Sequence, residues 1–211
     1  MYESLRQKLD SLNVTLVAVS KLQPLERIQK LYDLGHRDFG ENYVQELLFK
    51  KAQLPPDIRW HFIGHLQTNK VKQLIGHVQL IQGVDSLKLL KEIDRQALKK
   101  EIIQDCLFQV HIAKEETKFG FNEAELEEAW KELSAYKNVR VRGLMGMASL
   151  DASEEETGRE FLNLHRLFTK LGEGRKEFDT LSMGMSGDYE LAVKNGSNMV
   201  RIGSLLFGTR R

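Results

Sequence analysis

The sequence predicts an α/β fold in which eight parallel strands and their connecting helices close into one barrel. Short apolar runs alternate with amphipathic segments along almost the whole chain, and this alternation indicates a parallel sheet. Eight such apolar runs are present, which favours a closed (β/α)8 barrel. The alternative is an open doubly wound sheet, but its Gly-x-Gly-x-x-Gly fingerprint does not follow the first run.

Each predicted element rests on a local pattern. The strands are predicted at residues 14–21, 37–40, 59–65, 78–84, 105–112, 139–148, 178–185 and 199–207. The helices are predicted at residues 3–12, 24–35, 42–53, 69–75, 86–101, 122–136, 154–171 and 189–194. Pro24 suits a first helical turn, where its missing N–H is not needed. Ser86 and Asn122 are predicted N-caps, because such side chains accept from the free N–H groups of the first turn.

The chain has 211 residues, which is short for a fold of about 250 residues. It ends almost as soon as the eighth strand does. The helix at residues 3–12 is therefore expected to take the place of the missing eighth outer helix. No internal repeat, linker or low-complexity stretch divides the sequence, so we expect a single domain over residues 1–211.

Composition excludes several classes of protein. The net charge of +1 offers no basic field for nucleic acid. No apolar run approaches the roughly 20 residues of a membrane span, and the first ten residues have no apolar signal core. The one cysteine, Cys106, lies in an apolar run and has no partner for an internal disulfide. We expect it to be a buried structural thiol in a protein of the reducing cytoplasm.

Lys21 is the most informative residue, because it closes the apolar run that begins at Val14. The carboxyl ends of barrel strands are where active sites are built. Burial lowers the pKa of a lysine, and the neutral amine condenses with aldehydes to a Schiff base. Taken alone, a lysine that snorkels to solvent is the simpler interpretation.

The loops after the seventh and eighth strands resemble a phosphate grip. Ser186, Gly187 and Asp188 precede a short helix, whose first N–H groups can bind an anion. Gly203 and Ser204 can add N–H donors and a hydroxyl from the neighbouring loop. The tripeptide alone would indicate only a capped turn. Its pairing with the second loop favours a phosphate site, which is usual at this place in the fold.

Arg201 lies within an apolar strand and needs a partner, because a guanidinium keeps its proton. That partner is a carboxylate such as Glu41, a ligand, or both. Lys21 with a phosphate grip fits a Schiff-base aldolase acting on a sugar phosphate, or a pyridoxal phosphate (PLP) protein. Arg201 and Asn42 supply polar groups that a pyridine ring needs. Spacing does not decide between the two chemistries.

Six segments decide between them by resemblance. They are VAVSK at residues 17–21, FGENYVQE at 39–46, WHFIGHLQTNK at 60–70, GLMGM at 143–147, LSMGMS at 181–186 and VRIGSLLFG at 200–208. In this order they resemble the PLP homeostasis proteins, which share their barrel with the N-terminal domain of alanine racemase. The resemblance implies a barrel of PLP fold type III that lacks the racemase's C-terminal β domain.

The resemblance also implies roles for particular residues. Lys21 is implied to carry the cofactor, Arg201 to face its pyridine nitrogen, and Asn42 to lie near the ring. The residues implied to lie by the phosphate are Ser186, Gly187, Gly203 and Ser204. An arginine at the pyridine nitrogen makes the ring a weaker electron sink, since it does not favour a protonated ring.

We therefore expect a monomeric PLP-binding protein that stores, buffers or delivers the cofactor, with PLP-dependent apoenzymes as recipients. The alternative is a slow amino-acid racemase that uses Lys21 as its base. An aldolase remains only if the resemblance misleads. For His61, His65 and His111 we expect structural or supporting roles, with His65 nearest the pocket mouth.

Overall fold

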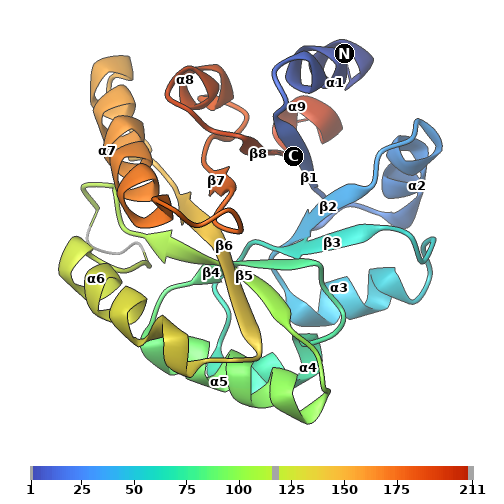
Figure 1. Ribbon diagram of the computed structural model, residues 1–211. Helices are drawn as coiled ribbons and strands as arrows, with labels where there is room; N and C mark the ends of the chain where they lie inside the picture. The colour runs from blue at the N-terminus through green and yellow to red at the C-terminus, as the bar shows by residue number, and fades with distance from the viewer. Residues whose placement is uncertain (1, 116–118, 209–211) are drawn as a thin grey trace.

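The computed structural model describes residues 2–115 and 119–208. Eight parallel strands follow one another around a closed ring, and the last pairs with the first. The strands are β1 (Thr15–Val19), β2 (Asp38–Glu41), β3 (Arg59–Phe62), β4 (Leu80–Val84), β5 (Gln104–Val110), β6 (Val139–Gly146), β7 (Thr180–Ser182) and β8 (Met199–Ile202). The predicted (β/α)8 barrel is confirmed (Figure 1).

Helices surround the ring, one or more in each crossover. They are α2 (Leu25–Asp33), α3 (Val44–Lys51), η1 (Thr68–Lys70) with α4 (Val71–Leu74), α5 (Leu87–Lys99), α6 (Glu123–Glu132) with η2 (Leu133–Ala135), α7 (Glu154–Gly172), α8 (Tyr189–Lys194) and α9 (Ser204–Phe207). The predicted caps are confirmed: Ser86 accepts from the Leu89 N–H, and Asn122 forms a capping box with Glu125. Across the described residues, no helix is both long and apolar enough to cross a bilayer.

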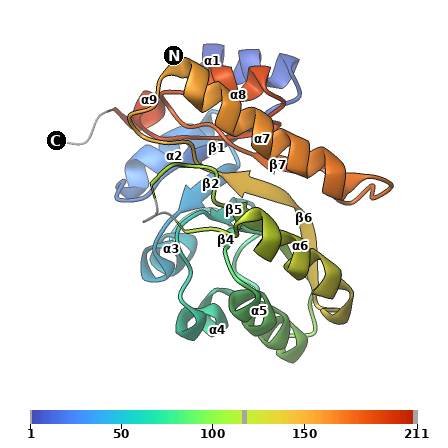
Figure 2. The same ribbon diagram turned by 90° about the vertical axis from the view of Figure 1, so that its left-hand side faces the viewer.

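Helix α1 (Tyr2–Ser11) occupies the place of the missing eighth cover, as predicted. It buries Leu5 and Leu9 against the barrel. At one side, the Arg6 guanidinium donates to the carbonyl of Leu34 beyond α2, at 3.1 Å. At the other side, Lys8 forms an ion pair with Glu190 of α8. Figures 1 and 2 show α1 lying beside α8 in both views.

The core has two parts. Outside the ring, aromatic side chains from the strands pack under the helices, led by Phe39, Trp60 and Phe108. Inside the ring, a smaller apolar cluster holds Val17, Leu80, Leu107, Met145 and Met199. This separation follows from strand geometry, since successive side chains point to opposite faces. Cys106 is fully buried, as predicted, and burial raises the pKa of its thiol.

Several strands end earlier than predicted. β1 ends at Val19 and β3 at Phe62, so Lys21 lies in a turn beyond its strand. β8 ends at Ile202 instead of running to residue 207, and residues 204–207 form α9. The neighbouring strand β1 has ended by then, and a strand without a neighbour leaves its backbone groups unpaired. The short helix satisfies them locally, as where the Phe207 N–H donates to the Gly203 carbonyl.

Candidate functional site

The topology gathers the predicted site residues at the carboxyl end of the barrel. β1 lies between β2 and β8, with Val17 level with Arg201 and Val19 level with Gly40. Lys21 follows β1, Asn42 follows β2 and Gly203 follows β8. Three positions that are far apart in sequence therefore leave adjacent strands at the same rim, where barrel proteins bind ligands.

The turn that carries Lys21 is held on both sides. The Ser20 hydroxyl donates to Glu41 Oε1 at 2.6 Å, and the Leu22 N–H donates to Glu46 Oε1 at 2.5 Å. Leu22 has a φ of 60°, a left-handed conformation that costs roughly 1–2 kcal/mol for a residue with a side chain. Lys21 itself is half-buried. The two carboxylates thus hold a strained turn in one position around the amine.

A buried lysine ties these two carboxylates together. The Lys50 ammonium lies 2.8 Å from Glu41 Oε1 and 2.6 Å from Glu46 Oε1, and it donates to the Ser20 carbonyl at 2.7 Å. Burial raises the pKa of Glu41, although bonds from Lys50 and Ser20 oppose this. Sequence reasoning missed Lys50. The available signal was its spacing of three from the buried Leu47, which places both on the inner face of α3.

Arg201 is a buried cation without an ion pair among the described residues. Its side chain donates to the Ser182 hydroxyl at 2.6 Å and to the Gly146 carbonyl at 2.9 Å, and both acceptors are neutral. The predicted alternative of an ion pair with Glu41 is wrong, because Glu41 pairs with Lys50. Burial lowers the pKa of Arg201 to about 10, which leaves it charged at neutral pH. An unpaired buried charge is costly, so this one indicates a ligand.

Polar side chains continue behind Arg201 through the barrel interior. Ser182 donates to Gln82 Oε1 at 2.7 Å, and Gln82 Nε2 lies 3.2 Å from His61 Nδ1. His61 Nε2 lies 3.1 Å from Asp38 Oδ1. His61 therefore has a supporting position, as expected, and not an exposed one. Sequence reasoning missed Gln82 and Ser182, although both are polar residues within apolar strands, the same signal that pointed to Arg201.

The two predicted phosphate loops meet. The Gly203 N–H donates to the Ser186 hydroxyl at 3.2 Å, which joins the β7–α8 loop to the start of α9. Asp188 Oδ1 accepts from the Met185 N–H at 2.6 Å and closes the turn. At the start of α9, the N–H groups of Ser204 and Leu205 precede the first bonds of the helix, which begin with Leu206 N–H to the Gly203 carbonyl. Together these loops offer several N–H and hydroxyl donors to one anion.

The two glycines of these loops differ in their surroundings. A Cβ on Gly187 would meet no heavy atom within 4 Å, so its backbone faces open space. A Cβ on Gly203 would lie 3.3 Å from Val19 Cβ, which is tight. Gly187 and Ser186 line a groove of about 820 Å³, together with Leu205. Lys21, Asn42 and Arg201 are not among its lining residues.

Two buried side-chain oxygen atoms where β2 ends lack a hydrogen-bond partner. They are Glu41 Oε2 and Asn42 Oδ1, at the end of β2. Buried acceptors of this kind are rare in folded proteins and point to a missing partner. The two oxygens call for a hydrogen-bond donor, whereas the unpaired Arg201 and the open face of Gly187 favour an acceptor or an anion. The residues present therefore fit a phosphorylated aldehyde such as PLP.

His65 and His111 have their hydrogen-bond partners outside this set. His65 Nδ1 lies 2.9 Å from Asp85 Oδ2, and the His65 ring stacks on Phe119 with centroids 3.8 Å apart. Its side chain is 39% exposed, which places it nearer to solvent than His61. His111 Nε2 lies 2.9 Å from the Glu115 carbonyl oxygen. Within residues 2–115 and 119–208, histidine, cysteine and carboxylate groups nowhere form a cluster suited to a metal ion.

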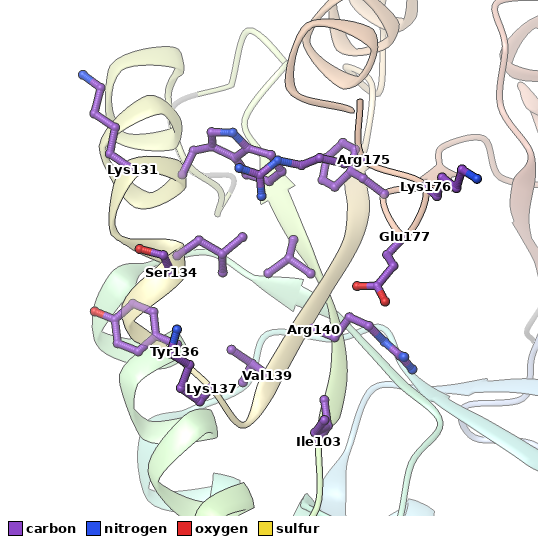
Figure 3. Close-up of a pocket in the computed structure, with 14 residues that line it drawn as sticks. Ile103, Lys131, Ser134, Tyr136, Lys137, Val139, Arg140, Arg175, Lys176 and Glu177 are labelled. Carbon is purple, nitrogen blue, oxygen red and sulfur yellow. The ribbon is translucent and has the colours of Figure 1, made fainter. Parts of the chain in front are cut away.

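A second groove lies at the opposite end of the barrel. It has a volume of about 690 Å³ and includes Val139 at the start of β6 and Phe178 before β7. Figure 3 shows basic side chains around it, with Arg175 reaching across to an aromatic ring. The Arg175 guanidinium lies 4.5 Å from the Trp130 ring centroid. None of the predicted site residues lines this groove, and the amino end of a barrel is where stability is expected instead of catalysis.

The fold and the rim define a class of protein. The family model of the alanine racemase N-terminal domain matches residues 2–211. Two curated relatives narrow the class, and both are PLP homeostasis proteins. The one from Aquifex aeolicus is 42% identical over 201 residues, which cover 93% of this chain and 87% of the relative. The one from Escherichia coli is 37% identical over 204 residues, which cover 93% and 86%. The chain belongs to this PLP homeostasis protein family.

Solved structures agree with this placement. PipY of Synechococcus elongatus, solved with PLP bound, is 37% identical and has a TM-score of 0.90, with 98% of both chains covered. Alanine racemase from Clostridium difficile is 16% identical with a TM-score of 0.76. This chain covers 55% of that longer chain. The likeness to the racemase concerns the fold alone.

Proposed function

We propose that this chain binds PLP at the rim described above and takes part in intracellular PLP homeostasis, by storage, buffering or delivery of the cofactor. The observation that carries the proposal is the buried, unpaired guanidinium of Arg201, one strand away from the strand that leads to Lys21. The names of the relatives and the PLP bound to PipY support the same ligand.

Each residue of the rim then has a defined task. Bound PLP supplies an aldehyde that can condense with an amine. Lys21 provides that amine from a turn held by Glu41 and Glu46. Arg201 donates toward the ring nitrogen. Asn42 lies at the edge of the ring.

The two loops after β7 and β8 bind the phosphate group. Ser186, Gly187, Gly203 and Ser204 supply N–H and hydroxyl donors, and the open face of Gly187 lets an anion approach the backbone. The Arg201 guanidinium is itself positively charged, so it does not favour protonation of the ring nitrogen. An unprotonated ring is less able to stabilise negative charge on an attached carbon. The site therefore holds the cofactor without strongly activating it. This favours a carrier over an enzyme.

The specific observation in favour of a second function is the His65–Asp85 contact of 2.9 Å near the rim. A carboxylate orients a histidine for proton transfer, and a two-base racemase needs a second acid opposite Lys21. A slow amino-acid racemase is the alternative function. The carrier is preferred because its site explains Arg201, whereas a racemase would gain more from an acid at that position.

The proposal includes the setting in which the protein works. A single buried cysteine fits the reducing cytoplasm. We propose a monomer that gives PLP to PLP-dependent apoenzymes. Transfer from the loaded protein to an apoenzyme, followed by the recovery of the apoenzyme's activity, measures delivery directly.

The first experiment is an absorption spectrum of the purified protein with PLP, followed by borohydride reduction and peptide mapping. We expect a visible Schiff-base band and a tag on Lys21. Lys21→Ala should lose the band and remain folded, whereas Lys30→Ala, a change at an exposed lysine on α2, should keep it. A tag on another lysine with Lys21 unmodified would overturn the assignment.

The same proteins are then assayed with alanine, serine and a mixed amino-acid panel. We expect turnover well below about 1 s⁻¹, the low end of the ordinary enzyme range. Faster racemisation that disappears in Lys21→Ala would contradict the carrier function and support the racemase function.

A further inference from the structure

A chain of polar side chains crosses the otherwise apolar interior of the barrel. It runs from Arg201 through Ser182, Gln82 and His61 to Asp38, and so joins strands β8, β7, β4, β3 and β2. The exposed fraction is 4% for Arg201, 3% for His61 and zero for Ser182 and Gln82. Polar groups at such depth are retained only where each one has a partner.

Every hydrogen bond of this chain has a definite direction. A guanidinium only donates, so Ser182 Oγ accepts from Arg201 and its own proton goes to Gln82 Oε1. That bond places Gln82 Nε2 toward His61, where the amide donates to Nδ1 at 3.2 Å. The proton of neutral His61 is then on Nε2, which donates to Asp38. Gln82 Nε2 also donates to Met199 Sδ at 3.2 Å, and the other donors all point toward the carboxylate of Asp38.

The direction gives Gln82 a particular task. Because Gln82 Oε1 accepts the Ser182 proton, the lone pairs of Ser182 stay directed at Arg201. Bonds aligned head to tail also polarise one another and strengthen together. The opposite side of the guanidinium is fixed by the Gly146 carbonyl at 2.9 Å. The plane of the guanidinium is thus set by two acceptors, one of which depends on Gln82.

We propose that Gln82 is a positioning residue for PLP recognition, which holds Arg201 through Ser182 so that the guanidinium donates to the ring nitrogen. This inference rests on the proposed function. It goes beyond it by assigning the ligand contact to an interior network and not to Arg201 alone.

The test uses Gln82→Met, which keeps a side chain of similar size and removes the hydrogen bonds to Ser182, His61 and Met199. The matched control is Gln104→Met. Gln104 is also buried, but its side chain donates to the carbonyls of Val78 and Asp105, which do not belong to the polar network. Each protein is loaded with PLP labelled with ¹⁵N in the ring, and the ¹⁵N chemical shift of the ring nitrogen is measured. Apparent PLP affinity is measured by the visible band.

We expect Gln82→Met to move the ¹⁵N shift toward that of a ring nitrogen without a donor and to weaken PLP binding about fivefold, the effect of one hydrogen bond. Gln104→Met should change neither. Equal ¹⁵N shifts in wild type and Gln82→Met would overturn the inference while leaving the proposed function intact. A wild-type protein that does not bind PLP would instead overturn the proposed function.

A second variant keeps the test decisive if Gln82→Met does not fold. Ser182→Ala removes the hydroxyl group that accepts the hydrogen bond from Arg201. It should move the ring ¹⁵N shift in the same direction. In the protein without PLP, NMR detects the slowly exchanging side-chain N–H signals of Arg201, which are assigned by their absence in Arg201→Lys. Both variants should lose these signals. Persistence of those signals in Ser182→Ala would contradict the assigned network.

Discussion

At the residue scale, the site depends on a few buried charges whose partners are fixed. Lys50 is 3% exposed and contacts two carboxylates and a carbonyl, so its charge is well satisfied. Arg201 is as deeply buried and contacts only neutral acceptors. The difference separates their roles, since Lys50 completes the protein's own structure and Arg201 retains donor capacity for a ligand.

Lys50→Met should lower the free energy of unfolding by about 3 kcal/mol, because it leaves Glu41 as a buried charge without its partner. Urea denaturation measures this difference. Lys51→Met, at the next and more exposed position of α3, should have an effect within about 0.5 kcal/mol. In the double variant Lys50→Met, Glu41→Gln, much of the loss should return, since the fully buried carboxylate is gone and the remaining partner, Glu46, is partly exposed. Equal losses for Lys50→Met and Lys51→Met would contradict the assigned role.

At the scale of elements, α1 is a structural part of the barrel. Leu9 is 1% exposed and packs in the main core, whereas Leu12, one residue beyond the end of the helix, is 52% exposed. Contacts to the region after α2 and to α8 hold the helix over β1, where the ring closes. Without this cover, the outer faces of β1 and β8 would lie open.

Leu9→Ala should therefore lower the free energy of unfolding by about 3 kcal/mol, in the range for a large-to-small change in a core. Leu12→Ala in the same segment should cost less than about 0.5 kcal/mol. Chemical denaturation followed by circular dichroism compares the two variants. If both had the same small effect, α1 would be an appendage and not the eighth cover.

The alternating pattern was enough to predict most elements, including α1 and the caps at Ser86 and Asn122. It did not predict where strands end, because an apolar run looks alike whether it continues as a strand or turns into a helix. The run after Ile202 is such a case, since only the end of the neighbouring β1 shows that no partner remains. The boundary is set by tertiary pairing.

The candidate site was predicted in part for a similar reason. Lys21 and the paired loops at Ser186 and Gly203 were recognisable because the barrel brings strand ends to one rim. The partners of Arg201 could not be predicted, since the sequence contains several polar residues that could pair with a buried cation. Glu41 was the obvious carboxylate, but the lysine on α3 is closer to it.

At the scale of the whole molecule, ion pairs at the amino end of the barrel set its resistance to acid. Burial alone would raise the pKa of Asp38, but hydrogen bonds from Arg59 and His61 outweigh it and leave the pKa well below its usual range. A carboxyl with a depressed folded-state pKa stabilises the fold above its unfolded pKa of about 3.9. That stabilisation is lost as the pH falls below this value.

Asp38→Asn should accordingly lower the free energy of unfolding by about 2 kcal/mol at pH 7, the typical effect of hydrogen bonds to a charged group. The gap between wild type and variant should narrow as the pH falls from 4 toward 2. Urea denaturation at several pH values checks this. Asp151→Asn, at an exposed position, serves as the control. A gap that stays constant down to pH 2 would show that ionisation of Asp38 is not involved.

The closure of β1 against β8 has a consequence for how the protein is made. Val17 and Arg201 are paired neighbours in the ring, although nearly the whole chain separates them in sequence. During synthesis, the ribosome releases Lys21 long before Gly203 and the second phosphate loop exist. A growing chain therefore presents the Lys21 amine before the proposed anion site exists. The candidate site is complete only with the last strand, so a ligand that contacts both Lys21 and Gly203 would draw together the first and last parts of the protein to be made.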